Sequence, residues 1–171
     1  MNQNKSLGQY TGLKIHINDD LDKNNITNQI EAVIAAVVER SSFIVSEGAK
    51  EAQVLAMLEN FKQQLAPSGL SFEEYLKQSE KTYEQLFNEL KVIAAEVIKK
   101  DAALSAVTQA EAITVNDNDL RGKIDDFARI SGCHPEQMYQ ELKKNGKLEA
   151  VYKEILWEKV TGFLLKNNCF V

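Results

Sequence analysis

The stretch from Thr82 to Glu111 contains neither glycine nor proline, and its apolar residues follow one helical stripe. The stripe comprises Leu86, Leu90, Ile93, Val97, Leu104 and Val107. A helix of about 30 residues would extend roughly 45 Å at 1.5 Å per residue. A globule of 171 residues has an expected radius of gyration of only about 15 Å. The sequence therefore predicts an elongated molecule.

Apolar residues at helical spacing predict further helices along most of the chain. Eight glycines and two prolines leave few places to interrupt them. Ser46 and the capping-box sequences that begin at Ser71 and Thr82 indicate where helices start, and Gly132 indicates where one ends. The predicted helices are 26–38, 46–65, a short helix after 71, 82–111, 116–132, 135–145 and 148 to the polar residues 166–168. The expected fold class is all-α, with long amphipathic helix hairpins as arms and one N-terminal strand.

The N-terminal strand is predicted from residues 7–17, where Leu13, Ile15 and Ile17 alternate with polar residues. The rest of the chain shows no sustained alternation. A single strand cannot form a sheet, so we expect it to pair with another chain, with its own copy in a dimer, or with a missing part of the protein. The expected organisation is an N-terminal segment, 1–25, with this unpaired strand and a linker, followed by a helical domain, 26–171.

Charge and hydropathy exclude several classes of partner. Twenty Lys and Arg against 25 Asp and Glu give a net charge of −5, which argues against nucleic acid and anionic membrane as partners. The N-terminus is polar, and no apolar run is long enough for a membrane span, so a cytoplasmic protein is expected. Cys133 and Cys169 lack metal-ligand spacing, and reduced thiols are expected.

Candidate catalytic groups are sparse. His134 and Cys133 are adjacent in sequence and so point in different directions, and His134 before Pro135 suits a helix cap. The acidic run at 117–126 is interleaved with basic residues, which is typical of a solvated helix face rather than a metal site. No glycine-rich phosphate loop is present. We therefore expect no enzyme activity, no cofactor and no metal site.

Surplus apolar residues are the more informative signal. Long helical arms cannot bury a wide stripe on both sides, and exposed apolar surface tends to mark a binding site. Methionine and aromatic residues suit a surface that accepts many sequences, because methionine repacks easily and rings supply area at low entropy cost. The candidate peptide-binding residues are Met57, Phe61, Tyr83, Phe87, Ile93, Leu104 and Tyr139.

Three stretches of local sequence carry a resemblance to a known family. They are Val-Val-Glu-Arg-Ser-Ser-Phe-Ile-Val at 37–45, Gly-Leu-Ser-Phe-Glu-Glu-Tyr-Leu at 69–76, and 145–165, where Asn-Gly-Lys-Leu leads to Glu-Lys-Val-Thr-Gly-Phe-Leu-Leu. They resemble the first-helix exit, a short helix and the final helix in the C-terminal domain of trigger factor, a ribosome-associated bacterial chaperone. The resemblance covers about residues 26–171, and Ser46 stands where that family usually has proline.

The resemblance implies a domain that binds unfolded or nascent polypeptides on apolar surfaces and assists folding without ATP. The family's ribosome-docking loop and its FKBP-like prolyl isomerase domain are not found in this sequence, although residues 7–13 resemble the strand that leads toward the isomerase domain. This predicts either a longer protein from which that domain has been removed or a natural short homologue. The alternative is a helical scaffold that binds one specific folded partner or itself, and the residues leave a homodimer open.

Overall fold

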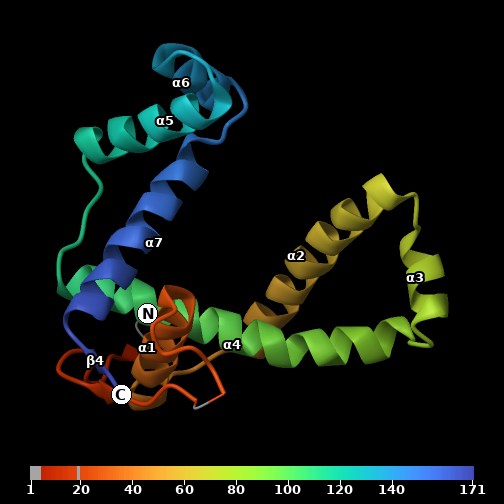
Figure 1. The fold of residues 1–171 in the computed structure, drawn as a ribbon. Coiled ribbons are helices and arrows are strands. Elements are labelled where there is room, and N and C mark those ends of the chain that lie inside the picture. The colour runs from red at the N-terminus through yellow and green to blue at the C-terminus, as the bar shows by residue number, and fades with distance from the viewer. Residues whose placement is uncertain (1–4, 19) are drawn as a thin grey trace.

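Helix α4 (Tyr83–Ala110) connects the parts of the molecule in the computed structural model, which describes residues 5–18 and 20–171 (Figure 1). Its 28 residues correspond to about 42 Å of helix. The C-terminal part of α4 lies in a body, and its N-terminal part reaches into a first arm (Figure 1). The predicted elongated, all-α architecture is confirmed.

The body also contains α1 (Ile26–Arg40) and the C-terminal part of α7 (Leu148–Lys166). The first arm consists of α2 (Glu47–Leu65), the 3-10 turn η1 (Ala66–Ser68), α3 (Phe72–Gln78) and the start of α4. The second arm consists of α5 (Asp117–Ser131), α6 (Pro135–Lys144) and the start of α7. The second arm stands above the body and the first arm extends to its right in the view of Figure 1.

Helix boundaries agree with the predicted capping signals. The hydroxyls of Ser71 and Thr82 accept hydrogen bonds from the backbone N–H groups three residues on, and the Glu74 and Gln85 side chains complete both capping boxes. Gly132 ends α5 with a φ of 67°, a left-handed conformation that glycine adopts without steric cost. Local sequence therefore sets where these helices begin and end.

The core of the body joins α1, α4 and α7. Val33 and Val37 of α1, Val107 of α4 and Leu164 of α7 are almost completely buried together. Leu13 and Ile15 of the N-terminal segment, each 5% exposed, belong to the same cluster. The N-terminal segment is thus part of the core that the helices build.

The pairing of the N-terminal strand corrects one expectation. Strand β2 (Lys14–Ile15) pairs in parallel with β4 (Cys169–Phe170), and β1 (Lys5–Ser6) pairs antiparallel with β3 (Ser42–Phe43). The expectation of a partner outside this chain is therefore wrong. Both partner strands have two residues, too few for an alternation of apolar and polar residues to reveal them.

Two close contacts fix the N-terminal segment against the body. A Cβ atom on Gly8 would lie 1.8 Å from the carbonyl oxygen of Arg40, so only glycine fits beneath the end of α1. At the other end of the segment, the buried Asn168 side chain accepts a hydrogen bond from Leu13 N–H and donates one to Tyr10 C=O. The segment is therefore held against the body at both ends, although only residues 14–15 of the predicted strand 7–17 form a strand.

Candidate functional site

Four of the seven candidate residues lie together in the first arm. Met57 and Phe61 come from α2, and Tyr83 and Phe87 come from α4. Tyr83 is 47% exposed, whereas the other three are half-buried. Met57 and Phe87 pack against the buried arm residues Val54, Leu58, Leu86 and Ala94. The arm thus has its own small core with aromatic side chains at its margin.

Helix α3 contributes aromatic rings that the candidate list did not include. The ring of Phe61 lies edge-on to that of Tyr75, with centroids 4.7 Å apart, and to that of Phe72 at 6.4 Å. The Tyr83 ring lies edge-on to that of Phe72 and is tilted against that of Phe87. Such edge-on pairs add to the stability gained from buried area. The capping box that predicts α3 could have drawn attention to these rings, because it places an aromatic residue at the first and fourth helical positions.

A pocket of about 370 Å³ opens between α2, α3 and α4, which form three sides of a triangle (Figure 1). The described residues that line it are Met57, Asn60, Phe61, Gln64, Tyr75, Leu86 and Leu90. The floor is apolar, and the two amides come from successive turns of α2. The pocket can accept an uncharged apolar group from solvent.

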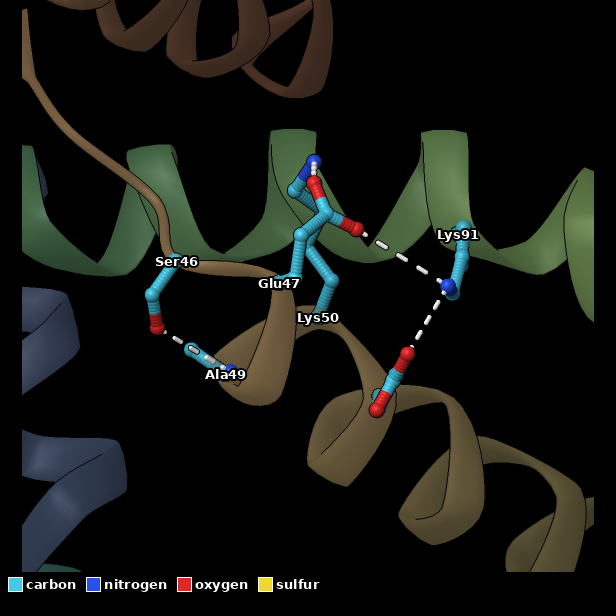
Figure 2. Close-up of polar contacts among 6 residues, drawn as sticks. Ser46, Glu47, Ala49, Lys50 and Lys91 are labelled. Carbon is cyan, nitrogen blue, oxygen red and sulfur yellow. Dashed lines mark hydrogen bonds and ion pairs between the residues drawn. The ribbon is translucent and has the colours of Figure 1, made fainter.

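Ion pairs fasten the base of this arm, as Figure 2 shows. The Lys91 ammonium on α4 lies 3.0 Å from a Glu51 oxygen and 3.8 Å from a Glu47 oxygen. Hydrogen bonding to Glu51 raises the pKa of Lys91, and a hydrogen bond from Lys50 lowers the pKa of Glu47. Because these groups are solvated, the pairs orient α2 on α4 more than they stabilise the fold.

Tyr139 lies in the second arm, in a pocket of about 520 Å³ between α5 and α6. Leu120, Ile124 and Pro135 form apolar walls there. Four charged residues also line this pocket: Asp117, Arg121, Asp125 and Glu136. This pocket therefore combines apolar and ionic surface.

Ile93 and Leu104 occupy two further places on α4. Ile93 is 48% exposed. It lines neither of the two arm pockets, nor the groove between α4 and α7. Leu104 packs against the body core and lines a groove of about 560 Å³ between α4 and α7, together with Trp157. The structure therefore distributes the seven candidates over both arms and α4, and does not bring them into one site.

Trp157, 44% exposed in this groove, was missed by sequence reasoning. Helix α7 has apolar residues on several faces, with Val151, Ile155 and Leu164 buried, so Trp157 did not stand out from the core stripe. The signal that could have found it is its position next to Leu156, which widens the stripe beyond what one buried face requires. The α4–α7 groove thus adds a third apolar surface.

The candidate catalytic groups of the sequence do not form a catalytic site in the part of the chain that the structure describes. The His134 imidazole Nδ1 accepts the Glu136 N–H at 3.3 Å and caps α6, as predicted. Cys133 is half-buried beside α6, and Cys169 is exposed in the body, both as free thiols. Within residues 5–18 and 20–171, no group of three or more His, Cys, Asp or Glu is arranged to hold a metal ion. In the same ranges no helix has the length and apolar character to span a membrane.

The fold and the pockets define a class of protein: an elongated helical domain whose body carries two arms with open, partly apolar pockets. Residues 13–166 match the family model of the bacterial trigger factor protein C-terminus. The chain belongs to this family, and the resemblance seen in the local sequence is confirmed.

Individual relatives agree with this assignment. Trigger factor of Clostridium beijerinckii is 30% identical over 165 residues, which cover 94% of this chain and 38% of that protein. Trigger factor of Salinispora arenicola is 31% identical over 125 residues, 73% of this chain and 28% of that protein. The chain therefore spans well under half the length of these relatives.

Two solved structures show the same fold. Trigger factor domains from Thermotoga maritima match with a TM-score of 0.66 at 22% identity, over 93% of both chains. A trigger factor chaperone, described for promiscuous substrate recognition in folding and assembly, matches with a TM-score of 0.61 at 23% identity, over 82% of this chain and 34% of that one. The all-α fold class is thus shared with known trigger factor domains.

Proposed function

We propose that this chain binds unfolded or nascent polypeptides on the apolar surfaces of its arms and assists their folding without ATP. The proposal rests on one observation: three open, partly apolar pockets lie at different places on the molecule. One is in each arm, and one is between α4 and α7. Membership of a chaperone family supports it, as does the promiscuous substrate recognition described for one solved relative. The proposed place of action is the cytoplasm.

The binding mechanism is passive. Removing about 100 Å² of apolar surface from water is worth roughly 2.5 kcal/mol at about 25 cal/mol per Å². One such contact alone corresponds to an affinity weaker than millimolar. Several contacts made by one polypeptide add through effective concentration. A polypeptide that buries its apolar segments in its own core no longer offers them, so release follows folding and needs no ATP or covalent step.

A titration with a permanently unfolded protein and with the folded form of the same protein tests the proposal. Calorimetry and NMR on the full chain should show binding of the unfolded form, with resonances of both arms and of the α4–α7 groove perturbed. Selective binding of one folded partner would instead support the helical scaffold. Binding of neither form would refute the proposal.

Exposed candidates allow a sharper version of this test. Tyr83→Ser and Ile93→Ser remove apolar groups that are 47% and 48% exposed, so each should weaken binding with little loss of thermal stability. Ile130→Ser is the matched control, because Ile130 is an exposed apolar residue of α5, 81% exposed, that is not one of the seven candidate residues. Equal effects of all three substitutions on binding would show that the candidates have no special role.

A further inference from the structure

The pocket between α2, α3 and α4, here called the first-arm pocket, differs from the other two in charge. Of the described residues that line it, none is Asp, Glu, Lys or Arg. Charged residues line the other two pockets: Asp117, Arg121, Asp125 and Glu136 in the second arm, and Asp101 and Lys153 in the α4–α7 groove. A charged group that entered the first-arm pocket would lose hydration without gaining an opposite charge. The pocket therefore suits a neutral group.

Two side-chain amides are among the residues that line this pocket. Asn60 and Gln64 lie one helical turn apart on α2 and are both exposed. Within the part of the chain that the structure describes, neither side chain has a hydrogen-bond partner. Each amide offers both a donor and an acceptor. Both are therefore available to bond a ligand that has donors and acceptors of its own.

The spacing of the two amides suits an extended main chain. Side chains four residues apart on a helix are separated by about 5–6 Å at Cβ. Alternate residues of an extended chain are about 6.6 Å apart, because each residue rises about 3.3 Å, and their backbone N–H and C=O groups point to the same edge. The flexible ends of Asn60 and Gln64 can bridge the small difference.

We propose that the first-arm pocket binds an extended, uncharged segment of a non-native polypeptide. An apolar side chain of the leucine or phenylalanine class enters against Met57, Phe61 and Leu90, and the amides of Asn60 and Gln64 hydrogen-bond the segment's backbone. This inference rests on the proposed function and assigns a ligand chemistry to one of its three surfaces. Backbone bonding explains how the pocket can be selective for conformation and tolerant of sequence, since every extended segment presents the same backbone groups.

The test uses the full chain and three short peptides with blocked ends. One peptide is neutral, with a single leucine in a glycine and serine background. The second carries N-methyl groups on the backbone around that leucine, and the third has glutamate in its place. NMR titrations give the affinity of each for the unmodified protein, for the double variant Asn60→Ala/Gln64→Ala, and for Gln63→Ala. Alanine maintains the helix, and Gln63 is a neighbouring exposed amide that does not line the pocket.

The neutral peptide should perturb resonances of α2, α3 and α4, and the double variant should bind it roughly ten- to thirtyfold more weakly, as expected for two lost hydrogen bonds. Gln63→Ala should leave its affinity unchanged. The N-methylated and glutamate peptides should bind the unmodified protein weakly, and the double variant should weaken the N-methylated peptide no further.

Equal affinity of the neutral peptide for the unmodified protein and the double variant would overturn the inference. Equal binding of the glutamate peptide, or no binding of the neutral peptide at millimolar concentration, would also overturn it. If an unfolded protein still bound selectively in those cases, the proposed function would stand without this pocket chemistry. Failure of the unfolded protein to bind would instead refute the function itself.

Discussion

Replacing Asn168 by alanine is expected to destabilise the junction between the two ends of the chain. The buried Asn168 amide accepts the Leu13 N–H at 2.9 Å and donates to the carbonyls of Tyr10 at 3.0 Å and Leu164 at 2.7 Å. Leu164 lies in the last turn of α7, where carbonyls have no donor within the helix, so the substitution leaves all three backbone groups without this partner. A buried group left unpaired costs about 1–3 kcal/mol. Because water can reach some of these backbone groups once the side chain is removed, the expected loss of unfolding free energy is about 2–4 kcal/mol in total.

Urea denaturation followed by far-UV circular dichroism measures this loss, with Asn167→Ala as the matched control. The Asn167 side chain is exposed and makes one hydrogen bond, to the Phe163 carbonyl, so the control should change stability by no more than about 0.5 kcal/mol. Hydrogen exchange of the Leu13 amide should also accelerate in Asn168→Ala and not in the control. A stability change below about 0.5 kcal/mol in Asn168→Ala, with unchanged Leu13 protection, would refute the assigned role of this side chain.

Three further substitutions test other parts of the structure. Gly8→Ala should lower the denaturation midpoint clearly, because its Cβ would lie 1.8 Å from the Arg40 carbonyl oxygen; an unchanged midpoint would mean that the N-terminal segment does not pass this close to α1. Phe61→Ala should cost about 1–3 kcal/mol, since the half-buried ring loses its aromatic contacts, and the loss should be seen as faster hydrogen exchange in α2 and α3 while α5 and α6 keep their protection. The pKa of Asp119 is lowered, first by the Asn116 N–H and then by Lys159, so its stabilisation is present above the ordinary carboxyl pKa and is lost as pH falls through the lowered one. Asp119→Asn should therefore reduce the fall in stability on acidification, and an unchanged pH dependence would contradict this.

Part of the candidate surface could be predicted from the sequence. The surplus of apolar residues predicted exposed side chains on long helices, and Tyr83 and Ile93 are nearly half exposed. The seven residues stay a prediction as binding residues. Sequence reasoning could not show that Phe61 would pack against Tyr75 of α3, because helical periodicity gives the face of a helix but not its neighbour. The amides of Asn60 and Gln64 were also missed, since isolated polar residues on a helix have no pattern.

The sequence by itself determined the helices and the elongation. Capping residues such as Ser71 and Thr82, and the breaker-free stripe of α4, act over a few residues, so their effect can be predicted without knowing the rest of the fold. Only the tertiary structure decided that the N-terminal strand pairs with β4 at the far end of the chain. Contacts between residues distant in sequence depend on how all the helices pack. A strand of two residues is also too short to show the alternation of apolar and polar residues that would predict it. The first-arm pocket was decided at the same level, because it exists only where α2, α3 and α4 meet.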